Sequence, residues 1–314
     1  MIKLLNLIRE QIGKPKAIVM AGGAGAGKSF LIKQLRLTGL PMFNPDKYVE
    51  DPAHPFHNNL GAAAGQVNKD VEAAAELGKS LIWDTTASNP SKIDALIDKG
   101  YDVYMVMVYT HPMIAFINNF SRERRVPKAA VFSTWSNVYG LLGRYKQTLG
   151  DNFSLYINMR GNKYAKEVEE FNKSAEKGPQ GVSDYLERYM EANGGKEAFG
   201  SSFRSDYELP SEEAIKGFEE EMANIEFDRN NVSMTKELKK YWIKFYDKNG
   251  AGPGDVKMKS KINTIQNRNV RDKDKAKAVL NDIAGMVVDK KFQEELKHSD
   301  VAEIDKKIQA FLKW

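Results

Sequence analysis

The residues with the clearest chemical potential lie in one glycine-rich stretch near the start of the chain. Residues 22–29 read Gly-Gly-Ala-Gly-Ala-Gly-Lys-Ser, which fits the spacing G-x-x-x-x-G-K-[ST]. Glycines let backbone N–H groups turn inward around phosphate oxygens. Lys28 would reach the β- and γ-phosphates of a nucleoside triphosphate, and the Ser29 hydroxyl would ligate Mg²⁺. The stretch therefore predicts a phosphate-binding loop, with ATP and Mg²⁺ as cofactors.

The sequence on either side of this stretch fits the same interpretation. Residues 16–20 read as a short buried strand, and residues 29–35 as the start of an amphipathic helix. A strand, a glycine-rich turn and a helix form the P-loop arrangement. The nucleotide is expected to contact nine residues: Gly22, Gly23, Ala24, Gly25, Ala26, Gly27, Lys28, Ser29 and Phe30.

Two acidic residues follow predicted strands further along the chain. Asp46 comes after a short strand that runs into a turn near Pro45, and Asp84 ends the apolar stretch 80–84. A carboxylate near the γ-phosphate can accept a hydroxyl proton, the role we expect for Asp46. Asp84 would orient Mg²⁺, and Thr85 and Thr86 would donate to substrate or phosphate. Asp46 and Asp84 could instead form or cap turns, which is the competing interpretation for both.

A cluster of arginines is a further candidate for catalysis. Arg122, Arg124 and Arg125 lie in one short segment that ends at Val126-Pro127. Guanidinium groups suit a phosphoryl transition state whose charge spreads over several oxygens. The segment predicts a lid over the nucleotide, although a basic run is also compatible with a solvated helix face.

The order of the predicted elements determines the fold class. Strands are expected at 16–20, 40–43, 80–86, 101–109 and 152–158, and the segments between them read as helices, including 113–124 and 129–149. Such alternation predicts an α/β three-layer sandwich with a mainly parallel sheet. Residues 1–178 form the expected nucleotide-binding domain. Residues 179–314 read as a mostly helical C-terminal region of unknown role.

Several of these blocks together resemble a known family. The chain resembles the P-loop kinases that include phage polynucleotide kinase and the zeta toxins over about residues 15–160. The resemblance is carried by residues 44–48, His54-Pro55, residues 84–86 with Asn89-Pro90, and residues 122–127. It implies that Asp46 is the base toward the acceptor hydroxyl and that the arginine segment closes over the nucleotide.

This sequence also departs from the family pattern. The arginines lie closer to Val126-Pro127 than in polynucleotide kinases, so the equivalent arginine is left open. The C-terminal half has no D-x-D-G-T phosphatase motif, which argues against a bifunctional end-healing enzyme. Residues beyond 160 have no counterpart in zeta toxins.

Composition limits the remaining possibilities. The chain has no cysteine and no apolar run long enough to span a membrane, so we expect a cytoplasmic protein without membrane contact. Its formal charge of +5 is a weak sign of an anionic partner. Residues 252–278 carry eight lysines and arginines against three aspartates, which fits either a nucleic-acid contact or a solvated segment.

The sequence leaves three functions open. The first is a kinase that transfers the γ-phosphoryl group of ATP to a hydroxyl, with a polynucleotide 5′-end as one candidate acceptor. The second is a zeta-toxin-like kinase of a nucleotide sugar. The third is a nucleotide-binding structural or assembly protein. Neither the acceptor nor the oligomeric state follows from the sequence.

Overall fold

The computed structural model describes residues 13–37, 39–57, 60–122, 126, 128–195, 275–296 and 298–313. The chain divides into two compact units, residues 1–199 with 279–314, and residues 200–278. The first unit contains the sheet and the glycine-rich loop. The N-terminal residues 1–12, for which the sequence predicts an amphipathic helix, and the basic stretch up to residue 274 lie outside the described residues.

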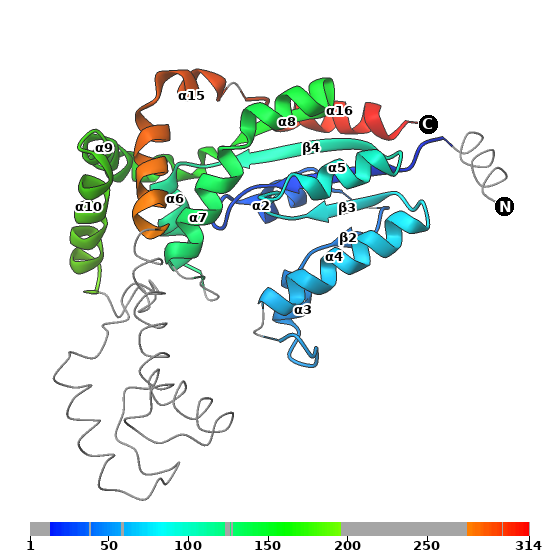
Figure 1. Ribbon diagram of the computed structural model, residues 1–314, viewed down its shortest axis with the longest axis horizontal. Coiled ribbons are helices and arrows are strands. Elements are labelled where there is room, and N and C mark those ends of the chain that lie inside the picture. Colours follow the sequence, from blue (N-terminus) through cyan, green and yellow to red (C-terminus); the bar gives the residue numbers. More distant parts are fainter. Residues whose placement is uncertain are drawn as a thin grey trace, which may run out of the picture. The chain divides into compact units, whose positions relative to one another are not determined.

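A five-stranded parallel sheet forms the centre of this unit (Figure 1). Its strands lie in the order β2-β3-β1-β4-β5, and every pairing is parallel. The strands are β1 (Lys16–Ala21), β2 (Met42–Phe43), β3 (Leu81–Asp84), β4 (Asp102–Tyr109) and β5 (Phe153–Ile157). The predicted α/β fold with a parallel sheet is therefore confirmed.

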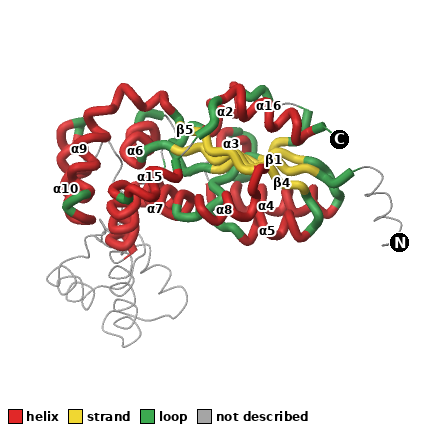
Figure 2. The backbone as a smooth tube through the Cα atoms, turned by 90° about the horizontal axis from the view of Figure 1, so that it is seen from above, coloured by secondary structure: helices red, strands yellow, loops and turns green. Residues whose placement is uncertain are grey.

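Helices fill the connections and cover the sheet on two faces (Figure 2). Because successive side chains of a strand point to opposite faces, β1 buries Ala17 and Val19 on one side and Ile18 and Met20 on the other. The helices are α2 (Lys28–Gln34), α3 (Asp46–Glu50), α4 (Leu60–Glu76), α5 (Ser91–Asp98), α6 (Pro112–Phe120), α7 (Lys128–Tyr139), α8 (Leu142–Leu149), α9 (Ala165–Ala175), α10 (Gly178–Ala192), α15 (Lys290–Glu295) and α16 (Val301–Leu312).

The end of the chain closes one of these faces. Ile304 and Ile308 of α16 are buried in the same apolar cluster as Ile18 of β1 and Leu31 of α2. The Lys16 side chain, only 7% exposed, donates to the carbonyl oxygens of Phe311 and Lys313, the latter at 2.8 Å. A lysine at the carboxyl end of a helix also meets the negative end of the helix dipole. β1 is thereby joined to the last helix.

The described part of the C-terminal region is helical, as predicted. α10, residues 279–288, α15 and α16 are all helices. α10 begins at Gly178-Pro179, the point where the sequence suggested a domain boundary. Residues 179–199 and 279–314 share the compact unit of the sheet. A functional division at residue 178 stays a prediction.

Two predicted helices differ from the structure. The helix expected over 129–149 is divided into α7 and α8 at Gly140-Leu141, where the backbone leaves the helical path. The helix expected over 113–124 ends earlier, at Phe120. No described helix is long and apolar enough to cross a membrane.

A half-buried histidine, His111, joins α6 to α9. His111 Nδ1 accepts a hydrogen bond from the backbone N–H of Met113 at the start of α6. Its other ring nitrogen, Nε2, lies 2.8 Å from Asn172 Oδ1 on α9. Burial lowers the pKa of His111 to about 4, outweighing the Asn172 hydrogen bond, which acts in the opposite direction.

This histidine gives the fold a predictable dependence on pH. Its pKa is lower in the folded than in the unfolded chain, so the unfolded chain binds the extra proton first. The neutral ring contributes its full stability above about pH 6.5, and that contribution falls as the pH drops toward 4. We expect urea unfolding to show a smaller pH slope for His111→Asn than for the parent between pH 7 and 5, by up to about 1.4 kcal/mol per pH unit. Equal slopes for His111→Asn and the parent would contradict a lowered pKa of His111 in the folded chain.

Candidate nucleotide-binding site

The glycine-rich loop lies at the centre of the sheet's carboxyl edge. It connects β1 to α2, and β1 lies between β3 and β4. Ligands of open α/β sheets bind at this kind of position, where the strand order reverses. Lys28 begins α2 and folds back over the loop: its Nζ donates to the Gly22 carbonyl oxygen at 2.8 Å.

The loop backbone requires glycine at two positions. Gly25 and Gly27 have φ angles of 78° and 95°, which side-chain-bearing residues rarely adopt. A Cβ atom on Gly25 would lie 2.3 Å from the Ala115 carbonyl oxygen, and one on Gly27 would lie 2.3 Å from Asn158 Nδ2. The outer side of the loop is therefore packed tightly against α6 and the end of β5.

Two asparagines hold the loop from this outer side. Asn118 of α6 donates from Nδ2 to the Gly25 carbonyl oxygen at 3.0 Å. Asn158, directly after β5, donates from Nδ2 to the Ala26 carbonyl oxygen at 2.9 Å. Neither residue was predicted from the sequence, because an isolated asparagine gives no motif. Both fix the loop without occupying its open side.

Asp84 is the most deeply buried carboxylate beside the loop. It ends β3, is 5% exposed, and has its Oδ1 3.9 Å from Lys28 Nζ. Burial raises the pKa of Asp84 to about 6; Lys28 opposes this shift and the negative charge of Asp46 adds to it. The structure thus brings Lys28 and Asp84 together, as expected for a phosphate site with a metal ligand.

Asn44 connects Asp84 to Asp46. Its Nδ2 donates to Asp84 Oδ2 at 3.0 Å, and its Oδ1 accepts from the backbone N–H of Asp46 at 2.7 Å. Asp46 begins α3, a helix where the sequence predicted a turn. Asn44 therefore links the Asp84 carboxylate to the backbone of Asp46. Asn44 was part of the block 44–48 that carried the family resemblance, but its bond to Asp84 was not predicted.

The other predicted contacts have local partners in the structure. Thr85 Oγ1 accepts from the Ala87 backbone N–H at 3.3 Å, and Thr86 Oγ1 lies 3.0 Å from Ser88 Oγ. These bonds fit the turn-forming interpretation, and substrate contact by either threonine stays a prediction. Ser29 is exposed in the first turn of α2, with Phe30 beside it.

Of the three arginines in the predicted lid, the structure describes Arg122. Arg122 Nη2 donates to Asn119 Oδ1 at 2.8 Å. Asn119 is fully buried and also bonds the Val126 backbone twice, accepting from its N–H at 3.0 Å and donating to its carbonyl oxygen at 2.8 Å. Arg122 is therefore fixed at the end of α6, four residues after Asn118. Arg124 and Arg125 lie outside the described residues.

The residues present fit a nucleotide-bound magnesium ion better than a metal held by protein alone. Among the described residues no group of three His, Cys, Asp or Glu side chains could enclose a metal. Mg²⁺ in nucleotide sites takes most of its ligands from phosphates and water, with one or two protein oxygens. A buried carboxylate, Asp84, and a hydroxyl in the first turn of α2, Ser29, match that requirement.

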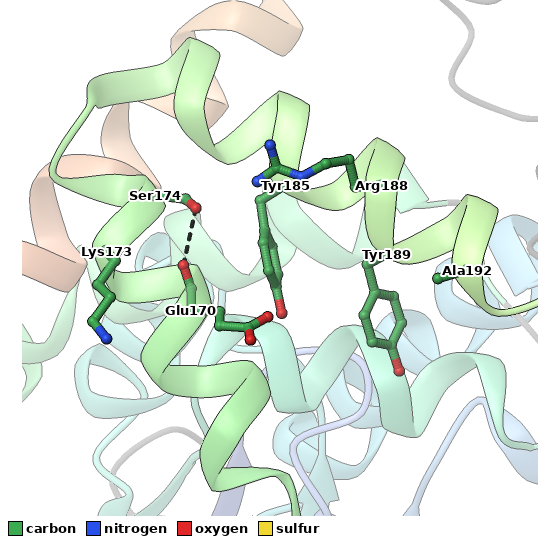
Figure 3. A pocket seen from close by; sticks show the side chains of 7 residues that line it. All are labelled: Glu170, Lys173, Ser174, Tyr185, Arg188, Tyr189 and Ala192. Carbon is green, nitrogen blue, oxygen red and sulfur yellow. Dashed lines mark hydrogen bonds between the residues drawn. The ribbon is translucent and has the colours of Figure 1, made fainter.

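A separate cavity of about 320 Å³ opens between α9 and α10 (Figure 3). It contains none of the predicted site residues. Ser174 on its wall donates to the Glu170 carbonyl oxygen, and Tyr185 and Tyr189 project between the helices. The lining residues are Glu170, Lys173, Ser174, Tyr185, Arg188, Tyr189 and Ala192.

Comparison with known proteins bears on the glycine-loop site. Residues 3–131 match the zeta toxin family model. This stretch contains the glycine loop, Asp46, Asp84 and Arg122, and it confirms the resemblance predicted from the sequence. It is less than half of the chain. Together with the loop, it supports a P-loop kinase or phosphotransferase of the zeta toxin type. No curated protein matches the chain.

Solved structures with similar folds give low overall scores. The PezAT toxin–antitoxin system of Streptococcus pneumoniae matches at 19% identity and a TM-score of 0.35, covering 47% of this chain and 70% of that one. The AvrRxo1-ORF1:ORF2 complex with ATP matches at 15% identity and a TM-score of 0.35, covering 48% of this chain and 56% of that one. A sulfotransferase domain of the Synechococcus olefin synthase matches at 18% identity and a TM-score of 0.31, covering 55% of this chain and 73% of that one.

The raised pKa of Asp84 predicts that its charge destabilises the ligand-free protein. A carboxyl group whose pKa is higher in the folded chain costs stability once it is ionised, so the cost is full above about pH 6 and absent below about pH 4. We expect Asp84→Asn to be more stable than the parent at pH 7.5 in EDTA, by up to about 3 kcal/mol.

Urea unfolding at several pH values tests this expectation. The advantage of Asp84→Asn should shrink as the pH falls from 6 to 4. A variant that is less stable than the parent at pH 7.5 would show that the ion pair with Lys28 outweighs the burial cost.

Proposed function

We propose that the protein is an ATP-dependent kinase that transfers the γ-phosphoryl group to a hydroxyl of an acceptor. The observation that carries this proposal is the grouping of Lys28, Asp84 and Asp46 at the open side of the glycine loop. A lysine, a buried carboxylate and a second carboxylate supply phosphate binding, metal binding and proton acceptance, the three tasks of phosphoryl transfer.

Each residue has a defined part in the transfer. Lys28 leaves the Gly22 carbonyl and contacts the β- and γ-phosphates. Asp46 accepts the proton of the acceptor hydroxyl while the hydroxyl oxygen forms a bond to the γ-phosphorus. The bond between that phosphorus and the β,γ-bridging oxygen breaks, which releases ADP. Arg122 stabilises the charge on the transferred group. Mg²⁺, held by Ser29 and Asp84, would neutralise the phosphate oxygens.

The acceptor is proposed to be a nucleotide sugar. The match of residues 3–131 to zeta toxins supports this choice over a polynucleotide end. The basic stretch that would favour nucleic acid lies almost wholly outside the described residues. A polynucleotide acceptor, and a protein that binds ATP without turnover, are the other outcomes of the test.

ADP release in the presence of each acceptor class tests the function. We expect turnover to require a nucleotide sugar and to be absent with ATP alone or with a 5′-hydroxyl oligonucleotide. Lys28→Ala should abolish it, because the phosphates lose their cation. Lys33→Ala, an exposed lysine on the same helix, is the matched control and should retain it. ATP binding without turnover by any acceptor would contradict the kinase assignment.

Asp46→Asn separates chemistry from nucleotide binding. The amide keeps the size of the side chain but cannot accept the acceptor's proton, so we expect kcat to fall on the order of 10²–10⁴-fold. The dissociation constant for ATP should stay within a few-fold of the parent value. A loss of only a few-fold in kcat would assign the proton to another group and leave Asp46 as the first residue of α3.

A further inference from the structure

Asn44 has a connection to the site that its sequence position does not reveal. The register of β2 against β3 pairs Met42 with Ile82 and Phe43 with Trp83. Continuing that register places Asn44 beside Asp84, just where the two strands end. The Asn44 amide donates to Asp84 Oδ2 at 3.0 Å, while Asp84 Oδ1 faces Lys28.

We infer that Asn44 is a positioning residue that orients the Asp84 carboxylate for Mg²⁺ and holds Asp46 next to it. This inference rests on the proposed function. With Oδ2 engaged by the amide, Oδ1 is directed toward the loop, where Lys28 and the metal would lie. The amide oxygen at the same time fixes the backbone of Asp46 at 2.7 Å. One side chain therefore orients the Asp84 carboxylate and fixes the backbone from which the Asp46 side chain extends.

The chain contains a second residue with the same local geometry but without the carboxylate. Asn89-Pro90-Ser91 begins α5 as Asn44-Pro45-Asp46 begins α3. Asn89 Oδ1 accepts from the Ser91 backbone N–H at 3.1 Å and from the Ser91 hydroxyl at 2.7 Å. Asn89 is exposed, and these bonds belong to its own turn. An asparagine before proline thus forms this turn on its own, so turn formation does not account for the Asp84 bond of Asn44.

The difference between the two asparagines defines the experiment. Asn44→Ala removes both the turn bond and the Asp84 bond, and Asn89→Ala removes a turn bond only. Asn44→Ser keeps a hydroxyl that can accept from the Asp46 N–H but is too short to donate to Asp84. Asp84→Asn tests the metal ligand itself. The four variants therefore separate the turn from the carboxylate contact.

Calorimetric binding of a non-hydrolysable ATP analogue, in Mg²⁺ and in EDTA, supplies the readout. Partners that orient a metal ligand typically contribute 10–100-fold to metal affinity. For the parent, Mg²⁺ should increase the affinity for the analogue relative to EDTA. We expect this gain to be smaller by about 10-fold or more in Asn44→Ala and Asn44→Ser. Asn89→Ala should keep the full gain. Affinity in EDTA should stay within a few-fold of the parent in these three variants.

The possible results separate this inference from the proposed function. Loss of the Mg²⁺ gain in Asp84→Asn together with its retention in Asn44→Ala and Asn44→Ser would overturn the role of Asn44 alone. Retention of the gain in Asp84→Asn would overturn both. If Asn44→Ala does not fold, Asn44→Ser carries the test, because its turn bond is preserved.

Discussion

The site depends on one electrostatic constraint: a nearly buried carboxylate, Asp84, must remain beside the phosphate-binding loop. Removing a carboxylate from water disfavours its charged form, which is why burial raises the pKa of Asp84 to about 6. Lys28 at 3.9 Å and the Asn44 amide at 3.0 Å offset part of that cost. A group kept in such a position at the expense of stability is typical of a functional site.

The fold supplies the rigidity that this arrangement needs. The central strand β1 lies between β3 and β4 and leads into the glycine loop. β3 ends with Asp84 at the same edge of the sheet. Asn118 and Asn158 hold the loop through its carbonyl oxygens, from α6 and from the end of β5. Since α6 also fixes Arg122 through Asn119, one helix supports both the phosphate loop and the first arginine of the predicted lid.

The sequence predicted the parts of this account that have a fixed spacing or a clear periodicity. The glycine loop, the parallel sheet and the nearness of Asp84 to Lys28 followed from a motif and from strands that end at one edge. The bonds of Asn118 and Asn158 to the loop and of Asn44 to Asp84 did not, because each joins residues far apart in the sequence and leaves no local pattern. The break at Gly140 was also missed, since apolar periodicity continues through it from α7 to α8.

A crystal structure with a non-hydrolysable ATP analogue and Mg²⁺ tests the central claim most directly. The account predicts the β- and γ-phosphates inside the loop of residues 22–29, with Lys28 Nζ moved from the Gly22 carbonyl oxygen onto them and Mg²⁺ between the phosphates and Asp84. An analogue bound in the cavity between α9 and α10, with Lys28 still bonded to Gly22, would contradict it.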